Sequence, residues 1–142
     1  MNTLSTKALE QALASLNQSI TVTKQLLQDK NTTTAHKQIL QAGVIQNFEF
    51  CFELSWKTLK RKLEQETSDA ALIGTMLYQE LIREGAQKGF IVNAEKWFEY
   101  RRDRNLTSHT YHAENAEKVY RTAIEFYPDA LDLLHKLKEK EK

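Results

Sequence analysis

Apolar residues recur along this chain at the spacing of one helix face and nowhere alternate at the length of a strand. In the first segment they continue to about residue 29, with serine, threonine and glutamine between them. Residues 31–34 have side chains that compete for backbone hydrogen bonds and therefore predict a break. The pattern predicts an amphipathic first helix whose apolar side holds Leu4, Ala8, Leu9, Ala12, Leu13, Leu16, Ile20, Leu26 and Leu27.

A second helix is predicted from about Thr34 to about Glu66, and it is apolar on more than one side. Phe50 and Leu54 lie off its main stripe, which consists of Ile45, Phe48, Phe52, Trp56, Leu59 and Leu63. Such a helix must be covered on more than one side, so we expect it to be the central helix of a bundle and part of a subunit interface. We interpret the basic residues at positions 57 and 60–62 as a solvated face.

The second half of the chain predicts three further helices. After a break at 68–74, a short helix contains Met76, Leu77, Leu81 and Ile82 and stops within 85–89. The next is predicted to begin near Asn93, a residue type that caps helix N-termini, and carries Trp97, Phe98 and Tyr100. The last runs from about Ala113 to the lysine-rich tail, with its buried side at Val119, Ile124, Leu131, Leu134 and Leu137.

We expect Pro128 to kink or restart this last helix, because proline removes a helix hydrogen bond and clashes with the preceding turn. The sequence therefore predicts an all-α fold, an up-and-down bundle of four long helices plus one short extra helix. We expect a single domain over residues 1–142, since the chain shows no linker or internal repeat.

Composition excludes several classes of function. The single cysteine, Cys51, rules out a disulfide framework or a cysteine-based zinc site, and we expect it in the core. No run of 18 apolar residues and no signal peptide is apparent, so we expect a cytoplasmic protein without a membrane span. Because 20 basic residues nearly balance 19 acidic ones, contact with RNA or a nucleotide would require a local patch.

The densest polar segment spans residues 99–112 and holds three arginines and two histidines. Arginine grips phosphate, and histidine exchanges a proton near neutral pH, which together suffice to break a phosphodiester without metal. On an uninterrupted helix, Arg104 and His109 point about 140° apart. They could converge only if the helix breaks after Asn105, a residue suited to the left-handed conformation, or if a second subunit supplies one of them.

Three other interpretations of the polar residues have weaker support. Its charges could be surface ion pairs, with His109 merely capping a turn. His109 and His112 have metal-ligand spacing, but Glu114 is the only evident third ligand. Glu49 and Glu53 resemble half of a di-iron site, yet the Glu-x-x-His partner motif is missing. We therefore predict neither a metal nor a cofactor.

Two blocks of sequence carry a family resemblance. Residues 43–60 read G-V-I-Q-N-F-E-F-C-F-E-L-S-W-K-T-L-K, and residues 104–111 read R-N-L-T-S-H-T-Y, which contains R-x-x-x-x-H-x-Y. Together they resemble the HEPN family, in the branch paired with minimal nucleotidyltransferases and named nucleotidyltransferase substrate-binding proteins. The likeness extends over about residues 4–137.

The resemblance implies a HEPN-like homodimer with the motif at the subunit interface. By analogy with toxins of toxin–antitoxin pairs, it implies a metal-independent endoribonuclease in which His109 is general acid/base and Arg104 the phosphate clamp. Asn105 would support both, as would Arg101 on the same helix face. The neighbouring nucleotidyltransferase would silence the site by transferring AMP to Tyr111. The alternative is a non-catalytic subunit that presents a nucleotide or another acceptor to that transferase.

Overall fold

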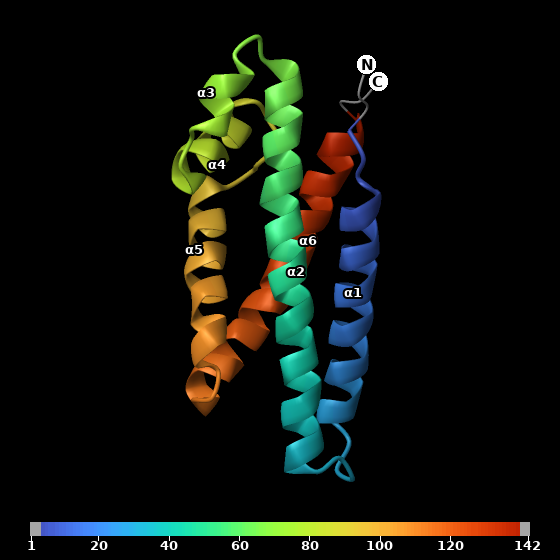
Figure 1. Ribbon diagram of the computed structural model, residues 1–142. Helices are drawn as coiled ribbons and strands as arrows, with labels where there is room; N and C mark the ends of the chain where they lie inside the picture. The colour runs from blue at the N-terminus through green and yellow to red at the C-terminus, as the bar shows by residue number, and fades with distance from the viewer. Residues whose placement is uncertain (1–3, 140–142) are drawn as a thin grey trace.

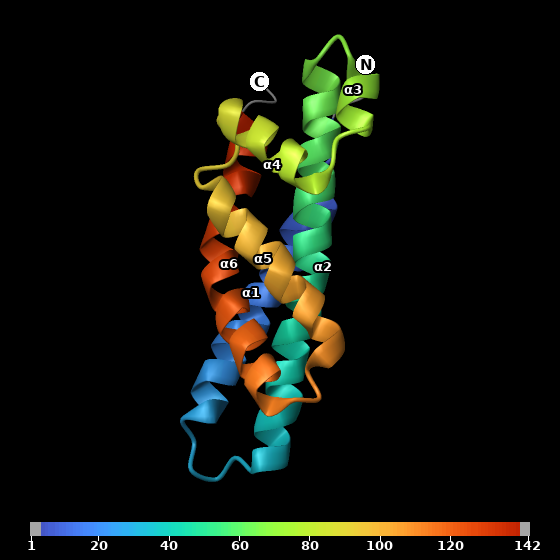
Figure 2. The same ribbon diagram turned by 90° about the vertical axis from the view of Figure 1, so that its left-hand side faces the viewer.

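The computed structural model describes residues 4–139, and every regular element in that range is helical. The elements are α1 (Lys7–Leu27), α2 (Thr34–Glu66), α3 (Ala70–Gly74), α4 (Tyr78–Gln87), α5 (Ala94–Asn105), the 3₁₀ turn η1 (Leu106–His109) and α6 (Ala113–Glu139). The helices α1, α2, α5 and α6 run alternately down and up, as Figures 1 and 2 show. The predicted all-α bundle is confirmed. None of the described helices is long and apolar enough to cross a membrane.

Helix α2 is the centre of the bundle, because it contacts each of the other five α-helices. Its predicted bounds and central position are confirmed, and Cys51 lies fully buried on it. Burial raises the pKa of the Cys51 thiol to about 12. The interpretation of the basic cluster as solvated is wrong for Lys62, which is only 5% exposed. The methylene stem of a lysine can pack in the bundle while its ammonium reaches a partner, here Glu66 at 3.7 Å.

The core joins three helices through an aromatic cluster centred on Phe126 of α6. Its ring lies 5.2 Å from that of Phe48 on α2, and 5.5 and 5.3 Å from those of Trp97 and Tyr100 on α5, all edge to face. This geometry is the favourable one for aromatic pairs. The cluster thus fixes α5 against α2 and α6.

Of the two outcomes predicted at Pro128, a kink or a restart of the last helix, the restart is wrong, because α6 continues through it to Glu139. Packing on both sides offsets the missing hydrogen bond, since Phe126 and Ala130 are fully buried. The predicted apolar stripe was also partly wrong: Ile124 and Leu131 are only half-buried. Val119, Leu134 and Leu137 are buried as predicted, and the buried positions that the prediction missed include Ala123, Phe126, Ala130 and Leu133.

The segment between α2 and α5 holds two short helices rather than one. The expected break at 68–74 contains α3, capped by Asp69, whose carboxylate accepts from the Leu72 N–H at 3.2 Å. Leu77 precedes α4 instead of lying inside it and is 73% exposed. The predicted end of this helix is confirmed, since Gly89 follows it with φ 88°, a conformation that glycine adopts without a Cβ clash.

We predict that Phe126→Ala lowers the free energy of unfolding by about 3–5 kcal/mol, because it removes the centre of the aromatic cluster and leaves a cavity. Leu72→Ala is the control: that side chain is 55% exposed, and its loss should change stability by no more than about 0.5 kcal/mol. Urea denaturation measures both. Equal effects of the two changes would contradict the role given to the cluster.

Candidate active site

Helix α5 is anchored to α6 at two points, which fixes the residues that it presents. Its predicted N-cap is confirmed, as the Asn93 side chain accepts from the Lys96 N–H at 3.4 Å. The buried Tyr100 hydroxyl donates to the Asp129 carboxylate of α6. Further along, the Asp103 carboxylate accepts from the Thr122 hydroxyl at 2.7 Å. The C-terminal turn of α5 is therefore held in place at the start of the candidate site.

The α-helix ends at Asn105, where a break is needed if Arg104 and His109 are to converge. The backbone conformation at this break differs from the expected one. Asn105 has φ −69° and ψ −19°, which is right-handed, so the left-handed conformation expected there is wrong. The chain tightens into η1 instead. The Thr107 hydroxyl donates to the Arg104 carbonyl at 2.8 Å, and the Ser108 hydroxyl donates to the Asn105 carbonyl at 3.4 Å. Such short-range bonds compete with the helical ladder and explain the change.

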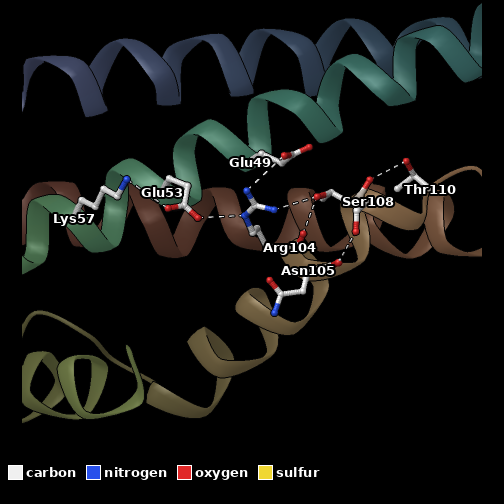
Figure 3. Close-up of polar contacts among 8 residues, drawn as sticks. Glu49, Glu53, Lys57, Arg104, Asn105, Ser108 and Thr110 are labelled. Atoms are coloured by element: carbon white, nitrogen blue, oxygen red, sulfur yellow. Dashed lines mark hydrogen bonds and ion pairs between the residues drawn. The ribbon is translucent and has the colours of Figure 1, made fainter. Parts of the chain in front are cut away.

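Arg104 is held from three sides (Figure 3). Its Nε donates to Glu53 Oε1 at 3.2 Å, and its Nη2 lies 3.7 Å from Glu49 Oε2. Its Nη1 donates to the Thr107 hydroxyl at 3.2 Å. All three charged side chains are about one-third exposed, at 31%, 33% and 34%. The guanidinium is therefore fixed between α2 and η1 while still reaching solvent.

The two glutamates are residues of the candidate site that sequence reasoning missed. They were weighed only as half of a metal site, although their spacing places both on one face of α2. An arginine has five N–H donors, and two of them form hydrogen bonds, with Glu53 and Thr107, while Glu49 lies within ion-pair distance. The other donors remain for a phosphate oxygen or another acceptor. The carboxylates thus orient Arg104 without using all of its hydrogen-bonding capacity.

Arg101, Arg104 and Asn105 meet at one pocket of about 410 Å³ between α2, α4 and α5. The Arg101 guanidinium carbon lies 4.7 Å from the centre of the Tyr78 ring, a cation–π contact. The Tyr78 hydroxyl donates to the Trp97 carbonyl at 2.9 Å, and burial raises the pKa of this phenol. Tyr78 therefore remains a neutral donor and supports the arginine.

His109 and Tyr111 lie past the helix end, in a separate group. The Tyr111 side chain is 75% exposed, with its ring centre 6.1 Å from that of His109 and 4.4 Å from that of His112. Tyr111 also lines a second pocket, of about 550 Å³, with residues of α2 and α6. Within residues 4–139, no hydrogen bond or ion pair joins Arg104 to His109.

The structure also places the charged residues on which the alternative interpretations depended. Arg102 forms a surface ion pair with Glu99 at 3.9 Å, as expected if the charges of this segment are surface ion pairs. Asp103 pairs instead with Lys118 on α6 at 3.7 Å, so it contributes to helix packing. No group of three or more His, Cys, Asp or Glu side chains among the described residues could hold a metal ion.

Known proteins resemble this chain over nearly its full length. A protein of Haemophilus influenzae named a probable ribonuclease HepT is 36% identical over 141 residues, covering 96% of this chain and 94% of that protein. A solved Haemophilus influenzae structure, described as the fold of a substrate binding domain of a nucleotidyltransferase, has a TM-score of 0.89 and 34% identity. It covers 94% of this chain and 99% of that one.

A second solved structure, from Thermus thermophilus, shares the fold with a TM-score of 0.62 at 22% identity, covering 86% and 98% of the two chains. Residues 4–139 match the family described as nucleotidyltransferase substrate binding protein like. This range includes both sequence blocks and all of the residues placed above. The chain belongs to the nucleotidyltransferase substrate-binding protein family, and its resemblance to HEPN proteins is confirmed.

Proposed function

We propose that this chain is a metal-independent endoribonuclease, the toxin of a toxin–antitoxin pair whose other member is a minimal nucleotidyltransferase. The observation that carries the proposal is the state of Arg104. It is oriented by two carboxylates, keeps donors for phosphate, and lies five residues before an exposed histidine. The name of the Haemophilus influenzae relative, a probable ribonuclease, supports the same activity.

In the proposed reaction, the ribose 2′-hydroxyl attacks the adjacent phosphorus and the bond to the 5′-oxygen breaks. His109 takes the proton of the 2′-hydroxyl or supplies one to the leaving oxygen. Arg104 stabilises the charge that builds on the phosphoryl oxygens. The products are a 2′,3′-cyclic phosphate and a 5′-hydroxyl, so no water or metal is consumed.

We further propose a homodimer in which the two copies of the motif face each other. Arg104 and His109 are not linked within one chain, and a second copy could complete the site. Apolar side chains on α2 are available for an interface, as Ile39 is 68% exposed and Phe50 58% exposed. This agrees with the excess of apolar residues along the second helix.

A second candidate function is a binding subunit without activity. It is favoured by the ion pairs of Arg104 with two carboxylates, because these carboxylates already offset the positive charge that would attract a phosphate. It also fits the description of the solved relative as a substrate binding domain of a nucleotidyltransferase. In this case Arg104 is a structural link between helices, and the chain presents a nucleotide or another acceptor to the transferase.

We predict that Arg104→Ala lowers RNA cleavage by about 10²–10³-fold and that His109→Ala lowers it by about 10²–10⁴-fold. Arg102→Ala and His135→Ala, both exposed on α5 and α6, are matched controls and should cleave normally. Cleavage should persist in EDTA. Expression of the wild type alone should slow bacterial growth, and the two site variants should relieve this.

Mixing the Arg104→Ala and His109→Ala proteins tests the homodimer in the same assay. If the site combines residues of two copies, mixed dimers contain one intact pair and regain part of the activity. No recovery after subunit exchange, or a monomer by light scattering, would contradict the composite site. A wild type that neither cleaves RNA nor slows growth would favour the binding-subunit function.

We propose Tyr111 as the acceptor of AMP from the transferase. The phenol oxygen would attack the α-phosphorus of ATP, forming a Tyr–O–P bond and releasing pyrophosphate, with the phenolic proton passing to a base. Of the five tyrosines, all described, Tyr111 alone is exposed. Its ring lies against His109 and His112, so the added phosphodiester would sit beside the histidines and block the approach of RNA.

We predict that incubation with the transferase, ATP and Mg²⁺ increases the intact mass by whole AMP units and abolishes RNA cleavage. Tyr111→Phe should prevent the mass increase, because it removes the nucleophile and keeps the ring. Tyr127→Phe, at a half-buried tyrosine, is the matched control and should be modified like the wild type. A mass increase that persists in Tyr111→Phe would show that the acceptor lies elsewhere.

A further inference from the structure

The pocket beside Arg104 combines aromatic rings with an excess of positive charge. Three cations line it against one carboxylate, that of Glu53. Its volume of about 410 Å³ lies within the range of roughly 300–1,000 Å³ typical of small-ligand pockets. The residues that carry the argument are Trp56, Lys60, Tyr78, Arg101, Arg104 and Asn105. Of these residues, only Arg104 takes part in the proposed cleavage step, with Asn105 and Arg101 as supports, and Trp56 and Lys60 have no role in it.

We infer that this pocket binds one nucleotide of single-stranded RNA, the one attached to the phosphate that Arg104 holds. The base lies against Trp56, and Lys60 and Arg101 bind the next phosphate along the strand. The inference rests on the proposed function in one respect, the role of Arg104 as phosphate clamp. The pocket thereby determines where on an RNA the enzyme cuts.

The aromatic part of the pocket consists of two rings in contact. The ring of Trp56 meets that of Tyr78 edge to face, with centres 6.0 Å apart and planes at 88°. Tyr78 is only 8% exposed and is fixed through its hydroxyl, whereas Trp56 is half-buried and lines the pocket. The Lys57 ammonium lies over the Trp56 ring, 5.7 Å from its centre. The partly exposed remainder of the indole is a stacking surface for a base in single-stranded RNA.

The cationic part retains its charge for a ligand. The Lys60 ammonium donates to a neutral group, the Gly74 carbonyl, at 3.5 Å. Arg101 rests on the Tyr78 ring at 4.7 Å. Neither contact is with a carboxylate, in contrast to Arg104 with its two glutamates. Lys60 and Arg101 are therefore the cations of this pocket best able to bind a phosphate.

RNA is favoured over a free nucleotide because the pocket is continuous with the cleavage site. Arg104 and Asn105 belong to both, so a phosphate on Arg104 lies at the edge of the pocket. The Asn105 side chain is exposed there and offers an amide donor and acceptor to the edge of a base. A strand can thus enter the pocket at one phosphate and leave it at another.

The test measures binding of a fluorescein-labelled 2′-O-methyl oligoribonucleotide to the whole protein by anisotropy. This probe lacks the nucleophilic hydroxyl, so binding is measured independently of cleavage. Trp56→Ala should raise the Kd at least about fivefold, the lower end for loss of a base–aromatic stack, and Trp56→Phe should recover part of the affinity. Lys60→Ala should weaken binding and flatten its salt dependence. Arg61→Ala, at the next residue on α2 and outside the pocket, should bind like the wild type.

Wild-type affinity in the Trp56→Ala and Lys60→Ala variants, with normal circular dichroism, would overturn the inference. So would equal weakening by Arg61→Ala, which would indicate a diffuse electrostatic surface. Strong competition by free AMP, with no effect of RNA length on affinity, would overturn the assignment to RNA. Failure of the proposed endoribonuclease function gives a different result from failure of this inference. In that case the probe still binds specifically, but unmodified RNA is not cut.

Discussion

The ion pairs between Arg104 and the two glutamates of α2 link the end of α5 to the central helix. They hold the C-terminal turn of α5 where the backbone changes to 3₁₀ geometry, and Thr107 joins both features by bonding the Arg104 side chain and its carbonyl. The aromatic cluster around Phe126 fixes the rest of α5. The proposed cleavage and the proposed RNA binding both depend on the position of Arg104, since this arginine borders the pocket and precedes the exposed His109 and Tyr111.

The carboxylates have opposing effects on a phosphate-binding arginine. They orient the guanidinium, so less conformational entropy is lost when a substrate binds. They also offset its charge, and a phosphate approaching Arg104 meets the repulsion of Glu49 and Glu53. The salt bridge of Glu53 with Lys57 at 3.8 Å reduces this repulsion and balances the local charge. The endoribonuclease and binding-subunit functions differ in which effect dominates.

Much of the fold could be predicted because helical periodicity is a local signal. The bounds of α2, the cap at Asn93 and the end of α4 before Gly89 all follow from residues near one another in the chain. The errors arose where distant packing decides. Pro128 stays helical because buried neighbours hold it, and Lys62 is buried because the bundle covers its stem.

The site was predicted only in part for the same reason. A local motif identified Arg104, Asn105, His109 and Tyr111, and helix spacing added Arg101; the structure places Arg101, Arg104 and Asn105 around one pocket. The pairing of Arg104 with Glu49 and Glu53 connects residues far apart in the chain, 51 positions in the case of Glu53. No local pattern reports such a contact. The pocket residues Trp56 and Lys60 were likewise assigned to the apolar stripe and the solvated face, because only folding brings them next to α5.

The single-turnover rate of RNA cleavage by Glu53→Ala tests most directly whether the carboxylates position Arg104 for catalysis. We predict a fall of about 10²-fold, the cost of a small misplacement of a catalytic group, with no weakening of RNA binding, since removal of a carboxylate also removes repulsion. Glu64→Ala, at a half-buried glutamate further along α2, should leave the rate unchanged. An unchanged or faster rate in Glu53→Ala would contradict the account and identify the glutamates as a restraint on Arg104.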